Sequence, residues 1–166
     1  PTTKILPHDQ VLALRSTHMR KNDRTYEAMW QINRARNWDD FKTATDLFHS
    51  PHQNIFFADQ KGDIGMISPG IIPIRNGWDG RWPADGKTLE DTWIGTVPFD
   101  SLPQRKNPGS GFLGNANNQL VSETRKHIIT KDWDAPYRAE RLQQLAQVSQ
   151  AHTLDTSAAW QLDNSS

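Results

Sequence analysis

The chain has 166 residues, with 19 basic and 19 acidic side chains and no cysteine. This length suits one domain, and the balanced charge creates no field that would attract nucleic acid or an anionic membrane. The lack of cysteine excludes disulfides and thiol nucleophiles, and no apolar run approaches the length of a membrane span, so no membrane partner is expected.

Two elements are predicted at the start of the chain. The range 11–17 alternates apolar and polar residues, which is the pattern of a half-buried strand. A cap at Asn22-Asp23 begins a short amphipathic helix that runs to Arg36. The predicted inward face of this helix consists of Tyr26, Met29, Trp30 and Asn33.

A second helix is predicted directly after the first, and the two should pack as a hairpin. Asn37 is its N-cap, and Asp39 and Asp40 place negative charge in the first turn, where the helix dipole favours it. Pro51 stops the helix. The predicted buried face consists of Phe41, Ala44, Leu47 and Phe48.

A β-hairpin and a long loop are predicted for the middle of the chain. Strands at 54–59 and 63–67 flank a tight turn, in which Gly62 supplies the positive φ that such turns need. The range 68–108 is rich in proline, glycine and tryptophan and has no hydrophobic period. It therefore predicts an ordered excursion over the surface.

The last third of the chain predicts a strand at 111–116, a helix at 136–150 and the start of another helix near Thr153. The residues of the helix at 136–150 that should face inward are Tyr137, Leu142, Leu145 and Val148. These elements predict an α+β fold, and we expect a single domain, or part of one, over residues 1–166.

The amides of Asn115-Ala-Asn-Asn118 form the first candidate site, at the end of the predicted strand. A side-chain amide donates hydrogen bonds without carrying charge, but Asn also commonly supports a turn by bonding to its own backbone. Arg138 and Arg141 have a similar ambiguity, because arginines at a helix start are often solvated or paired with nearby carboxylates. The residues alone favour the structural interpretation for both groups.

Metal and triad motifs are absent from the sequence. His49 and His52 are three residues apart at a helix end, but no HExxH or related spacing accompanies them, so no zinc site is expected. Asp59 and Asp63 flank the hairpin turn as solvated turn residues, and we assign them no chemistry. No GxSxG motif is present, so a conventional serine triad is not supported.

Three segments taken together change these expectations. They are NIFFADQKGDIGMISPGIIPIR at 54–75, WIGTVPFDSLPQRKNPGSGFLGNANN at 93–118 and DWDAPYRAERL at 132–142. They resemble the large-subunit pattern of the penicillin acylase family, which includes penicillin G acylases, cephalosporin acylases and acyl-homoserine-lactone acylases. The resemblance extends over nearly the whole chain in family order.

The resemblance implies the αββα sandwich of an N-terminal-nucleophile hydrolase, in which a serine at the start of the large subunit attacks the amide. The chain begins with Pro1, so the resemblance implies an internal piece of that subunit, truncated at both ends and inactive alone. The expected substrate is an N-acyl compound, such as a β-lactam with its acyl side chain or an acyl-homoserine lactone. The expected partners are the small subunit and the remainder of the large subunit, in the periplasm.

The resemblance also assigns roles to single residues. Asn117, the first Asn of the family's Asn-Asn pair, matches the oxyanion-hole donor, and Arg138 matches the arginine that orients it. Met29 and Gln53 match acyl-pocket positions that hold tryptophan and an aliphatic residue in penicillin G acylases. The substitutions at both positions argue against a preference for phenylacetyl groups.

No cofactor is expected for catalysis. Some family members bind a structural calcium, and Pro69 resembles one carbonyl donor, but His127 stands near the expected carboxylate ligand, so no metal is expected here. The alternative function is a noncatalytic binding module, in which Trp78, Trp82 and Trp93 form a platform for a sugar or an extended peptide. Packing of a long loop onto the core is the simpler role for these tryptophans.

Overall fold

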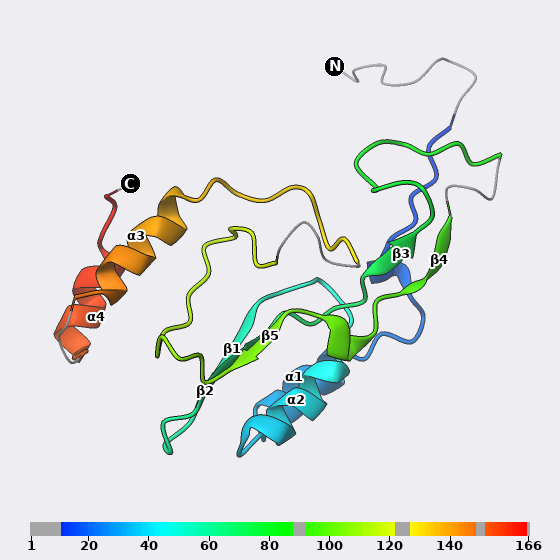
Figure 1. Cartoon of the computed structure of the whole chain (residues 1–166). Helices are drawn as coiled ribbons and strands as arrows, with labels where there is room; N and C mark the ends of the chain where they lie inside the picture. The colour runs from blue at the N-terminus through cyan, green and yellow to red at the C-terminus, as the bar shows by residue number, and fades with distance from the viewer. Residues whose placement is uncertain (1–10, 88–91, 122–126, 149–151, 166) are drawn as a thin grey trace.

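The structure is a computed structural model that describes residues 11–87, 92–121, 127–148 and 152–165. Helices and two small antiparallel sheets are joined by long loops (Figure 1). The helices are α1 (Thr25–Ile32), α2 (Trp38–Asp46), α3 (Tyr137–Ala146) and α4 (Leu154–Gln161), with 3-10 turns η1 (Thr17–Met19) and η2 (Phe99–Ser101). The larger sheet has the order β1-β2-β5, with β1 Ile55–Ala58, β2 Ile64–Ile67 and β5 Gln104–Lys106. The smaller sheet pairs β3 (Pro73–Arg75) with β4 (Trp93–Thr96).

The predicted helical hairpin is confirmed, since α1 and α2 pack against each other. Asn37 caps α2 as expected, because its Oδ1 accepts a hydrogen bond from the Asp40 amide at 2.9 Å. Phe41 and Ala44 are buried on the predicted face of α2, and Phe48 is buried just beyond its end.

The predicted inward face of α1 is wrong. Tyr26 is 90% exposed and Trp30 is 61% exposed, whereas Ala28 is fully buried. A small residue at the contact lets the two helix axes approach closely, and the larger side chains of α1 are then left on its outer side. The helix also ends at Ile32 rather than Arg36.

The β-hairpin is confirmed, and its two faces have different neighbours. Gly62 has the predicted positive φ, at 88°, in the turn between β1 and β2. On one face, the Phe57 ring lies 5.9 Å from the Trp38 ring and 5.2 Å from the Phe41 ring, so α2 covers this face. Met66 is paired with Phe56 in the register and faces the opposite side.

The region from 68 to 108 contains more regular structure than the sequence predicted. It supplies β3 and β4, and it returns β5 to the free edge of β2, where Met66 pairs with Arg105. Ile72, Val97 and Leu102 from this region form a buried cluster. The predicted surface excursion is therefore wrong for these residues, because the strands and the cluster fold the loop back onto the hairpin.

Two predicted strands are not formed. Residues 11–16 have no regular structure, and Val11 is 94% exposed, because this segment pairs with no strand among the described residues and so lacks the backbone hydrogen bonds of a sheet. Residues 111–116 also form no strand: Gly111 begins the segment at φ 65°, and Asn117 follows it at φ 62°. Positive φ at both ends turns the chain away from an extended path.

The two C-terminal helices follow the prediction more closely. α3 begins after Pro136, and Thr153 caps α4 through reciprocal hydrogen bonds with Thr156. Arg141 joins α3 to the end of α4 through a 2.7 Å ion pair with Asp163. Ala139 is the buried residue of α3, whereas Tyr137 is 64% exposed, so the predicted inward position of Tyr137 is wrong, as is that of the exposed Val148.

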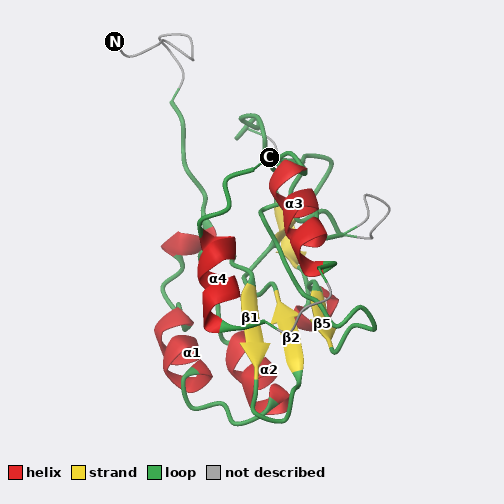
Figure 2. Cartoon of the chain, turned by 90° about the vertical axis from the view of Figure 1, so that its left-hand side faces the viewer, coloured by secondary structure: helices red, strands yellow, loops and turns green. Residues whose placement is uncertain are grey.

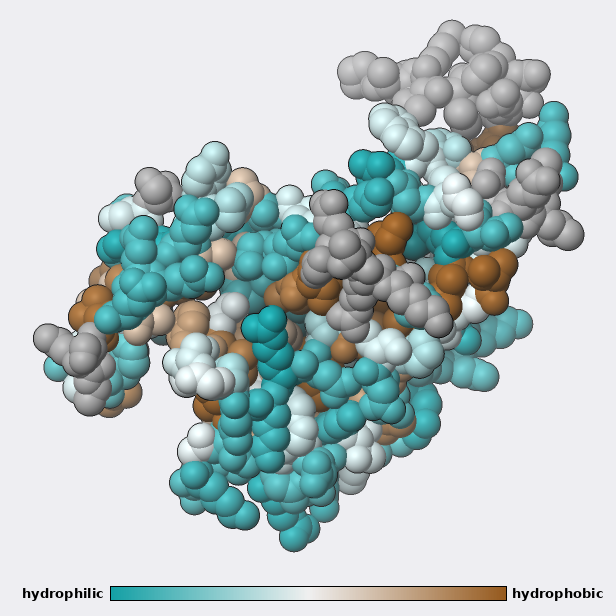
Figure 3. Space-filling view, viewed as in Figure 1, coloured by the Kyte–Doolittle hydropathy of each residue, from teal (hydrophilic) through white to brown (hydrophobic). Residues whose placement is uncertain are grey.

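The α+β class predicted from the sequence agrees with these elements, whereas the αββα sandwich stays a prediction. Most of the described chain between β5 and α3 is loop (Figure 2). Figure 3 shows hydrophobic residues in separate patches among hydrophilic ones on one face of the molecule. None of the described helices is long and apolar enough to cross a membrane.

Gly65 is predicted to be essential for the packing of α2 on the larger sheet. A Cβ atom at Gly65 would overlap the Trp38 ring, so Gly65→Ala should lower the free energy of unfolding by about 1–3 kcal/mol. Gly95 in β4 is the matched control, because a Cβ there would meet only Ile74 Cδ1 at 3.9 Å. Chemical denaturation of the intact protein measures both, and an equal loss in the two variants would contradict the packing argument.

Candidate active site

The structure brings together Asn117 and Arg138, which are 21 residues apart in the sequence. Arg138 lies in the first turn of α3, and its Nη2 donates to Asn117 Oδ1 at 3.0 Å and to the Ala116 carbonyl at 2.9 Å. The same nitrogen forms an ion pair with Asp134 at 2.7 Å. Because both side chains of that ion pair are more than half exposed, it stabilises the fold only slightly.

The contact with Arg138 fixes the orientation of the Asn117 amide. A guanidinium has only donors, so the Asn117 atom that faces it must be the carbonyl oxygen and not the nitrogen. The Nδ2 group of Asn117 has no acceptor among the residues that the structure describes, and the residue is exposed. Its two N–H groups are therefore available to an external acceptor.

Asn115 and Asn118 support the turn that presents Asn117. The Asn117 amide donates to Asn115 Oδ1 at 3.1 Å, and the Ala116 amide donates to Asn118 Oδ1 at 3.0 Å. The Asn117 carbonyl accepts from the Asp134 amide at 3.2 Å. The turn-supporting interpretation is confirmed for Asn115 and Asn118, which bond to the backbone. The side chain of Asn117 is left outside the turn, and its role as a donor to substrate stays a prediction.

A chain of hydrogen bonds leads from this turn into the sheet. Asn54 Nδ2, just before β1, donates to Asn115 Oδ1 at 2.6 Å, and the Ser68 hydroxyl donates to Asn54 Oδ1 at 2.6 Å. Ser68 is fully buried and also contacts His52 Nε2 at 3.2 Å. Burial lowers the pKa of His52, because it penalises the charged imidazole.

The sequence analysis assigned no role to Asn54 or Ser68. A polar residue directly before the apolar strand β1 was a visible signal at Asn54, but its partner Asn115 is 61 residues away. Nothing in the local pattern marks Ser68 as buried.

Met29 and Gln53 lie outside this hydrogen-bonded group. Met29 is half-exposed on α1, and Gln53 is exposed before β1. The backbone amide of Gln53 donates to the Pro69 carbonyl at 3.4 Å, so this carbonyl already has one partner. The assignment of Met29 and Gln53 to an acyl pocket stays a prediction.

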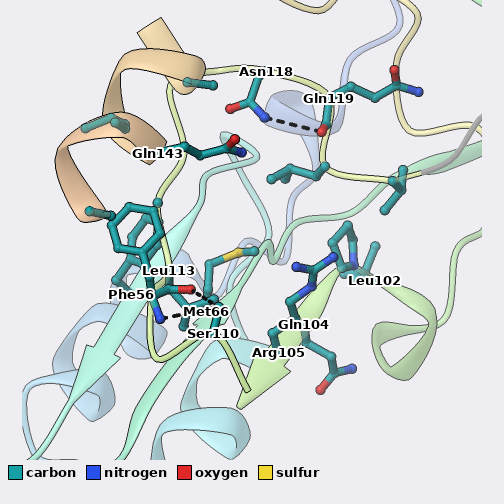
Figure 4. A pocket seen from close by; sticks show the side chains of 18 of the residues that line it. Phe56, Met66, Leu102, Gln104, Arg105, Ser110, Leu113, Asn118, Gln119 and Gln143 are labelled. Carbon is teal, nitrogen blue, oxygen red and sulfur yellow. Dashed lines mark hydrogen bonds between the residues drawn. The ribbon is translucent and has the colours of Figure 1, made fainter. Parts of the chain in front are cut away.

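A cavity of about 970 Å³ lies beside the amide cluster. Its walls come from the face of the larger sheet that α2 leaves uncovered, from the loop at 110–121 and from α3 (Figure 4). Phe56 and Met66 contribute from the sheet, Gln143 from α3, and Asn118 from the turn. The turn that carries Asn117 therefore borders a space large enough for a small molecule.

Carboxylates and histidines are not gathered as metal ligands. No group of three or more His, Asp or Glu side chains is arranged to hold a metal ion within the described ranges. Asp63 is engaged by Asn107 at 2.7 Å and by Lys106 at 3.0 Å, and the Asn107 hydrogen bond is the main cause of its lowered pKa.

Two of the three tryptophans of the proposed binding platform have a cation against the ring. The Arg15 guanidinium lies 4.4 Å from the ring centroid of Trp93, and Arg75 lies 5.5 Å from that of Trp78. The Trp78 indole N–H donates to the Trp82 carbonyl at 2.8 Å. Cation–π contacts thus occupy one face of two of the three rings.

Known proteins similar to this chain are acylases. The family model described as Penicillin amidase matches residues 3–166. Penicillin acylase 2 proenzyme of Pseudomonas sp. (strain SE83) is 28% identical over 92% of this chain and 20% of its own length. Acyl-homoserine lactone acylase QuiP of Pseudomonas aeruginosa is 31% identical over 93% of this chain and 18% of its own length. The chain thus spans about a fifth of the length of these relatives.

A solved structure supports the same relationship. The thermostable penicillin G acylase from Alcaligenes faecalis matches with a TM-score of 0.68 and 28% identity. The match covers 80% of this chain and 24% of that one.

Removal of the Arg138 side chain should loosen the Asn117 turn. We expect Arg138→Ala to speed hydrogen exchange of the Ala116 and Asn117 amides by about 5- to 10-fold, which corresponds to the free energy of roughly one hydrogen bond. Arg141→Ala is the matched control, because Arg141 lies one turn further along α3 and pairs with Asp163 instead. If the exchange rate of these two amides did not change in Arg138→Ala, or rose equally in both variants, Arg138 would not be what holds the turn.

Proposed function

The chain belongs to the penicillin amidase family, and from this premise we propose that it supplies the oxyanion-stabilising group of an acylase that cleaves the amide bond of an N-acyl substrate. The observation that carries the proposal is the orientation of the Asn117 amide, whose oxygen is held by Arg138 and whose N–H groups have no acceptor within the described part of the chain. The relatives named above are acylases, which supports the same class of reaction.

The proposed role of Asn117 follows from the charge that develops during amide hydrolysis. Attack on the substrate carbonyl moves negative charge onto its oxygen, and a neutral donor already in place stabilises that charge by about 3–4 kcal/mol. The donor needs no reorganisation, because Arg138 already holds the other end of the amide. We assign the nucleophile and its base to no residue of this chain, which spans about a fifth of its relatives' length.

Arg138 is proposed as a positioning residue for Asn117. Its charge also polarises the amide, because a cation at the carbonyl oxygen draws electron density away from the nitrogen and makes the N–H groups better donors. The Ala116 carbonyl shares the same guanidinium, so the backbone of the turn and the side chain of Asn117 are held together.

The acyl group of the substrate is proposed to contact Met29 and Gln53. Methionine adapts its shape to a flexible chain and offers no flat face for stacking on a phenyl ring. We therefore propose a flexible aliphatic acyl chain as the preferred substituent.

Asn117→Ala in the full-length acylase should lower kcat by about 100- to 1000-fold with a smaller effect on KM, since the donor acts mainly on transition-state charge. Steady-state kinetics with a chromogenic amide measures both constants. Arg138→Ala should also lower kcat, and the double variant should lose less than the product of the two single losses. A variant at Asn117 that kept full kcat but melted at a lower temperature would show that the residue only supports the turn.

The acyl preference gives a separate prediction. The full-length acylase should have a higher kcat/KM for an octanoyl amide than for a phenylacetyl amide with the same leaving group. Met29→Trp should shift this ratio toward phenylacetyl, because an indole face can stack on the phenyl ring. A strong phenylacetyl preference in the unaltered enzyme would refute the assignment of Met29 and Gln53.

A further inference from the structure

The hydrogen bonds that lead from the buried Ser68 to the Asn117 turn have only one possible assignment of donors and acceptors. The starting point is the backbone amide of Asn117, which is only a donor, so the atom of Asn115 that faces it must be Oδ1. The Asn54 atom at 2.6 Å from that oxygen must then be Nδ2. In this series of hydrogen bonds, each donor and acceptor is therefore determined by the preceding bond.

The same logic continues into the core. With its nitrogen turned toward Asn115, Asn54 presents Oδ1 to Ser68, whose hydroxyl must donate its single proton. His52 Nε2, at 3.2 Å from the Ser68 oxygen, must then donate, so the neutral imidazole carries its proton on Nε2. Only one assignment of donors and acceptors satisfies every hydrogen bond from His52 to Asn117.

Burial makes this arrangement costly to disturb. Ser68 has no exposed surface, and Asn54 and Asn115 are both partly buried. A fully buried polar group that loses its partner pays the full cost of desolvation, and a partly buried one pays a share of it. A change at Asn54 is therefore transmitted to Asn115 rather than absorbed by water.

We propose that Asn54, backed by Ser68, is a positioning residue for the oxyanion donor. It holds Asn115 Oδ1 in place, Asn115 holds the backbone amide of Asn117, and the position of that amide determines where the Asn117 side chain lies. The inference rests on the proposed function of Asn117. Asn54, directly before β1, contacts the turn through Asn115, whereas Arg138 contacts it through Ala116 and Asn117.

Asn54→Asp is the sharpest test, because it keeps the shape of the side chain and replaces one donor with an acceptor. The introduced carboxylate can still accept from Ser68, but it faces Asn115 Oδ1 with lone pairs. In the full-length acylase we expect kcat to fall by about 10-fold or more, with KM changed less than about 2-fold, as for other small displacements of a catalytic group. Relative to the unaltered enzyme, kcat should recover as pH falls, since a protonated carboxyl group can donate to Asn115 again.

The decisive measurement combines Asn54→Asp with Asn117→Ala. If Asn54 acts through Asn117, the change at Asn54 will have little further effect on kcat once the Asn117 amide is gone. If Asn54→Asp lowered kcat by the same factor in the Asn117→Ala background, or changed mainly KM, the inference would be overturned and the proposed function would stand. If Asn117→Ala alone kept full kcat, the proposed function would fail and this inference with it.

Two further variants separate positioning from stability. Ser68→Ala removes only the hydroxyl that orients Asn54, so it gives a milder version of the same pattern if Asn54→Asp does not fold. Asn107→Ala is the matched control. Like Asn117, Asn107 has a positive φ, at 45°. Like Asn54, it uses both ends of its side-chain amide, because Oδ1 accepts from the Ile64 amide and Nδ2 donates to Asp63, at the turn end of the hairpin. We expect Asn107→Ala to lower the melting temperature and leave kcat unchanged. Equal losses of kcat in Asn107→Ala and Ser68→Ala would contradict the proposal.

Discussion

The strand β2 is held on more sides than any other part of the described sheet. β1 and β5 pair along its two edges, and Trp38 of α2 packs directly on Gly65. A shift of one residue would turn Gly65 away from the indole and place a side chain in its path, so the register has one solution. The position of Ser68, the first residue after β2, follows from this constraint.

Ser68 connects the packed part of the molecule to an exposed one. Residues from three separate segments meet through its hydroxyl, the Asn54 amide and the Asn115 amide. Exposed loops are usually free to adopt several conformations, because water can replace any of their hydrogen bonds. The turn at Asn117 differs, since it is bonded to the partly buried Asn54, which is itself held by the fully buried Ser68.

Local signals in the sequence predicted the elements whose stability is local. The cap at Asn37 identified α2, whereas the alternation at 11–17 suggested a strand that has no partner to pair with among the described residues. The strand at 104–106 is the reverse case: its residues carry no apolar pattern, and it forms because β2 offers a free edge. The site follows the same rule, because the bond between Asn54 and Asn115 spans 61 residues, and no pattern within one segment encodes it. The family resemblance, and not the local chemistry, singled out Asn117 within the cluster.

The left-handed backbone of Asn117 narrows the choice of residue at this position. Glycine adopts φ near 62° without cost, and asparagine tolerates it better than most side chains. Glycine would keep the turn and remove the amide, whereas glutamine would keep an amide and strain the turn. Directed evolution toward new substrates would therefore find almost no accepted variation here. Useful diversity would have to enter at positions with ordinary backbone, such as Phe56 and Gln143 in the cavity wall or Met29 at the proposed acyl contact.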